Sequence, residues 1–231
     1  METIETDIKT NIEMALEVIL GLIVLVAIFW VLNSSTPGVK TLPASFNLAI
    51  PFTPQAPNNN WDRNEDCEET SVAMANAFLT GNTIKKLPAD AAQNAINNLK
   101  AWEQSNLGYN ANTGVDATTK MAEGAFGLRI QQINNYTEED LKSALVAGHP
   151  ILMPLNAKVL NPEKYQLNGP LYHMIVIRGY KGDTFITNDP GTNGGESNQY
   201  PFSILYNASA DWNQAQHQLD PNTKAALVVY K

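Results

Sequence analysis

The longest apolar stretch of the chain lies near its N-terminus. Between Ile12 and Leu32, charge occurs only in the first turns, at Glu13 and Glu17, and every residue from Val18 onward is apolar or glycine. A helix over these residues would be about 31 Å long, enough to cross the hydrocarbon core of a bilayer. The pattern therefore predicts one membrane-spanning helix at residues 12–32.

Two features favour a retained anchor over a cleaved signal peptide. The segment 1–11 is acidic rather than basic, and no Ala-x-Ala sequence follows the apolar run. Lys9 and Lys40 flank the span, so the positive-inside rule barely separates the two orientations. We expect an N-terminal tail at 1–11, a linker with proline and glycine at 33–45, and one globular domain at 46–231 that lies outside the cytoplasm on a single-pass anchor.

In the globular region, apolar residues recur at helical spacing first and in strand-like runs afterwards. Spacing and end signals predict helices from Cys67 to Leu79, over 86–106 and 116–123, and from Thr137 to Gly148. Apolar runs bounded by turn residues predict strands at 151–155 and 225–230 and a hairpin across 171–191. Pro154 favours an edge position for the strand 151–155. This order predicts an α+β fold, with a helical part packed on an antiparallel sheet.

The predicted hairpin brings together two residues with useful chemistry. If its turn is centred near Lys181, His173 and Asp189 each lie eight residues from the centre. Directly opposed residues of an antiparallel pair have Cβ atoms about 5 Å apart. The pattern therefore predicts a histidine beside a carboxylate.

The single cysteine of the chain, Cys67, is predicted at the start of a helix. Asp66 followed by Glu69 resembles a capping box with Asp66 in the cap position, which places Cys67 in the first turn. Amide dipoles at a helix N-terminus lower the pKa of a thiol. The charges of Glu68 and Glu69 would oppose a thiolate, unless these side chains point away or pair with a cation such as Arg63.

Charge and composition exclude several classes of function. The chain has 15 Lys and Arg against 23 Asp and Glu, a net charge of −8, and no basic run, which argues against a nucleic-acid partner. One cysteine and three histidines do not suggest a zinc site, and no P-loop motif indicates a nucleotide. The acidic cluster at 62–69 matches no calcium loop and is interpreted as a solvated face. We expect no metal and no cofactor.

Together, a thiol, an imidazole and a carboxylate permit acyl transfer. His173 could take the proton of Cys67 and return it to a leaving group, while Asp189 fixes the imidazole tautomer. The backbone N–H of Cys67 is one candidate oxyanion donor, and the side-chain amide of Gln55 is a second. Each residue also has a structural interpretation: a buried cysteine, a core histidine and an aspartate that starts a turn.

The sequence resembles the C39-like branch of the papain-type cysteine peptidases over roughly residues 48 to 230. The resemblance rests on the order of five segments: Ile-Pro-Phe-Thr-Pro-Gln at 50–55, Asp66-Cys67 at a helix start, Gly-His-Pro-Ile at 148–151, Tyr-His-Met-Ile-Val-Ile-Arg-Gly-Tyr at 172–180 and Asn-Asp-Pro-Gly at 188–191. It implies a papain-like fold with Cys67 as nucleophile, His173 as base and acid, Asp189 as its orienting residue and Gln55 as oxyanion donor.

One position departs from the family pattern. Many members place glycine directly after the catalytic cysteine, whereas this chain has Glu68, as in a Cys-Glu-Glu bacterial variant. The best-known relatives trim double-glycine leader peptides and are fused to an exporter, features that are not expected here. The resemblance implies a membrane-anchored cysteine peptidase or amide hydrolase that cleaves a peptide or protein substrate through an acyl-enzyme. An inactive papain-like binding module and an acyltransferase or transamidase are the alternatives.

Overall fold

A computed structural model describes residues 2–33, 41–61, 65–165 and 171–231, and within the first range it describes side chains for residues 14–29. The chain divides into two compact units, Met1–Thr41 and Leu42–Lys231, which are considered separately. Most of the predicted linker, residues 34–40, lies outside the described residues, and its last residue begins a strand.

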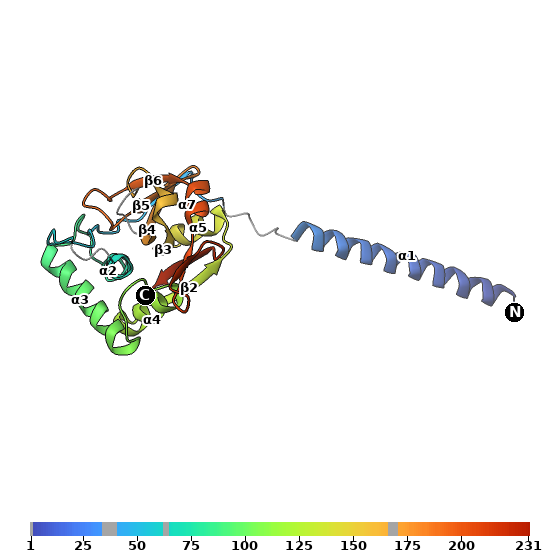
Figure 1. Ribbon diagram of the computed structural model, residues 1–231. Coiled ribbons are helices and arrows are strands. Elements are labelled where there is room, and N and C mark those ends of the chain that lie inside the picture. The colour runs from blue at the N-terminus through green and yellow to red at the C-terminus, as the bar shows by residue number, and fades with distance from the viewer. Residues whose placement is uncertain (1, 34–40, 62–64, 166–170) are drawn as a thin grey trace. The chain divides into compact units, whose positions relative to one another are not determined.

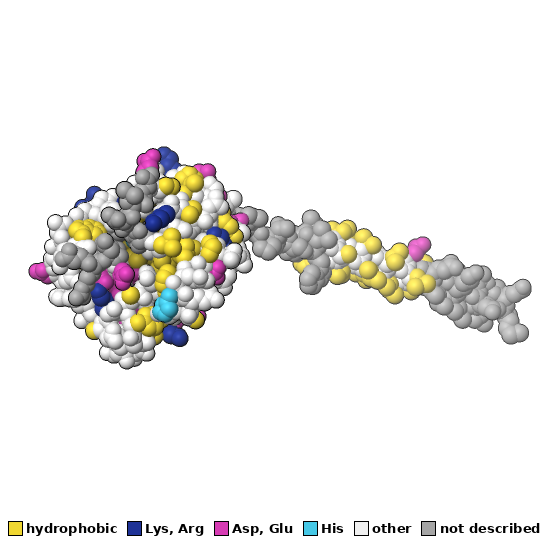
Figure 2. All heavy atoms as spheres, viewed as in Figure 1, with side chains coloured by type: hydrophobic (Ala, Val, Ile, Leu, Met, Phe, Trp, Pro, Cys, Tyr) yellow, Lys and Arg dark blue, Asp and Glu magenta, His cyan; other side chains and the backbone are white. Residues whose placement is uncertain are grey.

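The first unit contains one helix, α1 (Glu2–Asn33), which extends N-terminal to the predicted span and through most of the predicted tail. Its described apolar side chains are exposed along the helix, from Met14 to Phe29 (Figure 2). Among the residues whose side chains the structure describes, no helix is both long enough and apolar enough to cross a bilayer. The predicted span 12–32 extends beyond those side chains at both ends.

The second unit is built on a seven-stranded antiparallel sheet in the order β2-β9-β3-β4-β5-β6, with β1 paired to the end of β4. Its central strands are almost completely buried because apolar residues occupy both faces. A separate two-stranded sheet joins β7 and β8. The strands are β1 (Ser45–Asn47), β2 (Arg129–Asn134), β3 (Ile151–Asn156), β4 (Tyr172–Lys181), β5 (Thr184–Asn188), β6 (Asn198–Pro201), β7 (Asp211–Asn213), β8 (Gln218–Asp220) and β9 (Ala225–Tyr230).

Six helices accompany this sheet among the described residues. Helix α2 packs on β4 and β3, α4 on β2 and β9, and α5 on β1, β3 and β4. Figure 1 shows α2, α3 and α4 gathered on one side of the unit, away from α5 and α7. The helices are α2 (Cys67–Leu79), α3 (Ala89–Asn106), α4 (Val115–Phe126), α5 (Glu138–Val146), α6 (Ala157–Leu160) and α7 (Phe202–Ala208). The α+β fold predicted from the sequence is confirmed.

The sheet differs from the prediction at β3 and β2, and β1 and β6 are further strands that were not predicted. β3 is an interior strand rather than an edge, because β4 pairs along its whole length and β9 pairs with Ile151 and Leu152. Proline has no backbone N–H to donate to a neighbouring strand. Pro154 is tolerated because β9 pairs only with Ile151 and Leu152, so no hydrogen bond to β9 is lost at Pro154. Strand β2 was not predicted, since its apolar residues Ile130 and Ile133 lie three apart rather than two.

Candidate active site

His173 and Asp189 meet in the structure, although not in the predicted register. The turn of the hairpin lies between Lys181 and Thr184, and Val176 pairs with Asn188. Extending this register places Asp189 across from Ile175, two residues from His173 and on the same face. His173 Nε2 and Asp189 Oδ1 are 2.8 Å apart, and both side chains are buried. The predicted pair is formed, whereas the predicted direct opposition is wrong.

A β-bulge in β4 makes this meeting possible. The register changes by one residue between Ile177 and Gly179, so that Arg178 has no partner on β5. Without the bulge, Asp189 would lie opposite Val176 and point to the other face of the sheet from His173. Arg178 is held at the bulge by donating Nη2 to the carbonyl of Leu48 at 2.8 Å. The bulge therefore sets the face on which Asp189 lies.

Asp189 accepts hydrogen bonds at both carboxylate oxygens. Oδ1 also accepts from the Gly191 backbone N–H at 2.9 Å. Oδ2 accepts from Lys164 Nζ and from the Tyr165 hydroxyl, each at 2.7 Å. Burial alone would raise the pKa of Asp189, but His173 and Lys164 together bring the pKa well below its ordinary value. Asp189 is therefore a fixed negative charge beside the imidazole.

Cys67 is the first residue of α2, as predicted, but the predicted capping box is not formed. Asp66 makes no side-chain cap and instead pairs with Lys100 of α3. The Cys67 thiol is buried, 3% exposed, and donates to Glu68 Oε2 at 2.8 Å. Burial raises the pKa of the Cys67 thiol well above its ordinary value, and Glu68 and Glu69 raise it further. The expectation of a lowered thiol pKa is therefore wrong, because burial and these carboxylates outweigh the helix terminus.

The prediction that the acidic cluster is a solvated face is wrong for three of its members. Glu65 is exposed as predicted, and Asp62 lies outside the described residues. Asp66, Glu68 and Glu69 are buried, and Glu103 of α3 is buried against them. Burial raises the pKa of Glu68 to about 8 and that of Glu103 to about 7. Among the described residues, Glu69 Oε2 and both Glu103 oxygens are buried and have no hydrogen-bond partner. Within the same residues, no group of three or more His, Cys, Asp or Glu is arranged to hold a metal ion.

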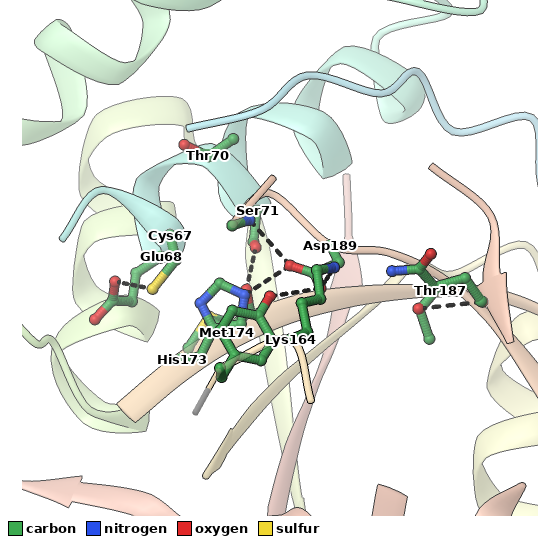
Figure 3. Close-up of polar contacts among 12 residues, drawn as sticks. Cys67, Glu68, Thr70, Ser71, Lys164, His173, Met174, Thr187 and Asp189 are labelled. Carbon is green, nitrogen blue, oxygen red and sulfur yellow. Dashed lines mark hydrogen bonds and ion pairs between the residues drawn. The ribbon is translucent and has the colours of Figure 1, made fainter. Parts of the chain in front are cut away.

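Helix α2 and strand β4 bring the thiol to the side of His173. Ser71 of α2 donates Oγ to the Met174 carbonyl of β4 at 3.3 Å. The Met174 backbone N–H interacts with the Cys67 sulfur and lowers its pKa. The sulfur therefore lies against the residue that follows His173. In the close-up, the imidazole lies between the Cys67 and Asp189 side chains (Figure 3). His173 Nδ1 has no hydrogen-bond partner among the described residues.

Gln55 is also buried and is tied to the Asp189 loop. Its backbone N–H donates to the Pro190 carbonyl at 2.9 Å, and its side-chain Oε1 has no partner among the described residues. The structure therefore places Gln55 beside the segment that carries Asp189. Its role as an oxyanion donor stays a prediction.

Sequence reasoning missed three residues of this site. Lys164 and Tyr165 contact Asp189 from a turn that has no regular apolar pattern. Glu68 was considered only as a charge near Cys67, and its direct contact with the thiol depends on a side-chain direction that spacing does not give. The only available signal was the departure from glycine at position 68.

One solved structure supports the same fold, and two others resemble the chain more weakly. A putative C39-like peptidase from Bacillus anthracis matches with a TM-score of 0.52 and 17% identity, covering 81% of this chain and 98% of that one. A double glycine motif protease from an AMS/PCAT transporter, solved with its leader peptide, gives a TM-score of 0.44 at 16% identity over 80% of this chain and 94% of its own. The Pseudomonas avirulence protein AvrPphB gives a TM-score of 0.34 at 14% identity, over 79% of this chain and 97% of its own. No curated protein sequence matches significantly.

A family model places the chain by sequence. The model of the Peptidase_C39 like family matches residues 47–220, which include Gln55, Cys67, His173 and Asp189. This match spans most of the second unit and agrees with its α+β fold. The chain belongs to the Peptidase_C39 like family.

Proposed function

We propose that the protein hydrolyses peptide or amide bonds through an acyl-enzyme on Cys67. The observation that carries this proposal is the His173–Asp189 hydrogen bond of 2.8 Å on the strand that packs against the Cys67 helix. Because Nε2 faces Asp189, Nδ1 is the nitrogen left to exchange a proton with the thiol. A buried carboxylate in this position fixes the tautomer and stabilises an imidazolium.

The reaction would run in two halves with balanced protons. The thiol proton passes to His173 Nδ1, and the Cys67 sulfur attacks the carbonyl carbon of the substrate. The imidazolium then protonates the departing amine, which leaves an acyl thioester. Water adds to the thioester with His173 as base, and the thiol is restored as the acid departs. The Cys67 backbone N–H and the Gln55 amide would stabilise the oxyanion in both halves.

Hydrolysis of a fluorogenic peptide mixture by the full chain tests this function. Cys67→Ala and His173→Ala should each abolish hydrolysis, because each removes a group that the acyl-enzyme route requires. His217→Asn is the matched control: His217 is exposed and has a φ of 50°, which asparagine tolerates. Full activity in Cys67→Ala would end the proposal.

A papain-like binding module whose thiol is unused is the second candidate. Two observations favour it: the burial of Cys67 and the raised pKa of its thiol. Such a module would bind peptides without turnover, and Cys67→Ala would leave that binding unchanged. Transfer of the acyl group to an amine would instead appear as a ligated product by mass spectrometry.

We also propose that α1 anchors the protein in a membrane by a single span at 12–32, with the second unit outside the cytoplasm. The support is the exposed apolar surface of the helix, from Met14 to Phe29. The wild-type chain should sediment with membranes and resist carbonate extraction, whereas Leu22→Arg combined with Leu25→Arg should release it. Protease added to intact cells should digest the second unit; protection of that unit would contradict the orientation.

A further inference from the structure

The thiol of Cys67 is engaged by a carboxylate and not by the histidine. Its S–H donates to Glu68 Oε2 at 2.8 Å, while His173 Nδ1 has no partner among the described residues. Cys67, Glu68 and His173 are all buried, so water does not readily replace the contact between Cys67 and Glu68. Figure 3 shows Glu68 and His173 on different sides of the Cys67 sulfur. Cys67 and His173, the two members of the proposed acyl-transfer pair, are thus adjacent, but no hydrogen bond joins the thiol to His173 Nδ1.

Glu68 is itself held in place. Its second oxygen, Oε1, accepts the Thr113 backbone N–H at 2.8 Å, and Thr113 is fixed in turn because its carbonyl accepts the Tyr172 hydroxyl at 3.0 Å. Tyr172 directly precedes His173 in β4. Glu68 therefore receives one donor from the loop before α4 and one from the nucleophile, and its orientation does not depend on solvent.

We propose that Glu68 is a positioning residue that keeps the Cys67 thiol protonated and turned away from His173, so that the site rests in an inactive state. This inference rests on the proposed function. On activation, the thiol swings from Glu68 to His173 Nδ1, its proton passes to that nitrogen, and a thiolate and an imidazolium result. Glu68 then loses one donor and keeps the Thr113 N–H.

Electrostatics supports the direction of this effect. Burial raises the pKa of Glu68 to about 8, so its carboxylate is ionised in alkaline solution, where a negative charge beside the sulfur opposes the formation of a second one. Among the described residues, no ion pair joins Glu68 to a lysine, arginine or histidine, and Arg63 lies outside those residues. The titratable groups that act on Cys67 or Glu68, or are acted on by them, are Glu69 on α2, Glu103 on α3, Tyr165 before β4 and Tyr172 on β4. His173 on β4 lies beside the sulfur (Figure 3), and Asp66 and Lys100 act on Glu103.

Alkylation of the full chain with iodoacetamide tests the proposal, because Cys67 is the single cysteine. Glu68→Gln keeps the shape of the side chain and removes its charge. We expect the alkylation profile of this variant to shift to lower pH, with a rate about tenfold higher at pH 8.5. Glu65→Gln, which removes an exposed carboxylate two residues before Cys67, should leave the profile unchanged. An unchanged or slower reaction in Glu68→Gln, with its fold intact by circular dichroism, would overturn the proposal.

The infrared S–H stretching band of the single thiol gives a second, independent measurement. In the wild type, we expect a band displaced by a strong hydrogen bond, retained in His173→Ala and moved toward the free-thiol position in Glu68→Gln. The reverse pattern would show that His173 holds the thiol and would refute the resting state. Neither readout requires turnover, so a failure of the proposed hydrolysis and a failure of the Glu68 restraint are separate results.

Discussion

Gly191, in the turn that follows β5, lies against the imidazole of His173. A Cβ atom at Gly191 would lie 3.0 Å from the Nε2 and Cε1 atoms of His173 and 2.8 Å from the Tyr165 hydroxyl. The absence of a side chain at this position allows both rings to reach Asp189.

Replacing Gly191 with alanine should therefore disturb the orientation of His173. The added methyl group would displace the Tyr165 hydroxyl from Asp189 and press on the imidazole, with an expected stability loss of about 1–3 kcal/mol and reduced kcat/KM. Urea denaturation and peptide hydrolysis measure the two effects. Gly194→Ala is the control, since a Cβ there would have no neighbour within 4 Å. Equal behaviour of the two variants would contradict this account.

Lys164 stabilises the ionised form of Asp189. Lys164→Met should cost about 1–3 kcal/mol at pH 7, because a buried carboxylate loses a charged donor. The lowered pKa of Asp189 adds stability above about pH 4, and this stability is lost as the pH falls toward the folded-state pKa. The variant should therefore show a smaller loss of stability on acidification, measured by urea unfolding from pH 7 to pH 3. Lys158→Met removes an exposed lysine and should match the wild type.

The buried carboxyls of α2 and α3 should give stability the opposite pH dependence. Their raised pKa values mean that the folded chain binds more protons than the unfolded chain between about pH 4.5 and pH 8. Stability should be greatest below this window and fall as the pH rises through it. Glu103→Gln should flatten this slope in melting curves at pH 5, 6.5 and 8, whereas Glu123→Gln, at an exposed position, should retain it. A wild-type stability that rises steadily over this range would refute the prediction.

The side-chain amide of Gln55 should act on the transition state. Gln55→Ala should lower kcat by about 10²–10³-fold with little change in KM, as expected for the loss of one oxyanion donor. Alkylation of Cys67 forms no oxyanion and should proceed at the wild-type rate. Gln132→Ala, at an exposed amide on β2, serves as the control. Unchanged kcat in Gln55→Ala would remove Gln55 from the mechanism.

The packing of α3 on α4 depends on a second glycine. A Cβ at Gly124 would lie 2.2 Å from Cζ2 of Trp102, so the indole would have to move. Gly124→Ala should destabilise the protein by about 1–3 kcal/mol, even though alanine favours helices over glycine by about 1 kcal/mol. Adding Trp102→Leu should restore part of the loss, because it makes room for the methyl group. Additive losses in the double variant would exclude a steric cause.

Local patterns in the sequence determined most of the secondary structure. Helix α5 begins directly after Thr137, because the Thr137 hydroxyl and the Asp140 carboxylate complete a capping box. Helix α4 ends directly before Gly127, which adopts a left-handed conformation with a φ of 65° that favours glycine. The sequence also predicted that Cys67 starts α2 and that His173 and Asp189 lie on one hairpin. Such features can be predicted because helix ends and strands depend on residues that are close in sequence.

The tertiary structure alone decided how these residues meet. The bulge at Arg178 put Asp189 on the face of His173, and the packing of α3 on α2 buried the carboxyls of Glu68 and Glu69, which the sequence suggested were exposed. The contact of the Cys67 thiol with Glu68 and the pairing of Lys164 with Asp189 depend on side-chain directions and on loops without periodicity. Sequence spacing fixes the order and the face of residues along one element. The burial of a side chain and the direction in which a charged side chain points are set by the other elements that pack against its own element. For Cys67, burial and the nearby carboxyls determine the pKa of the thiol.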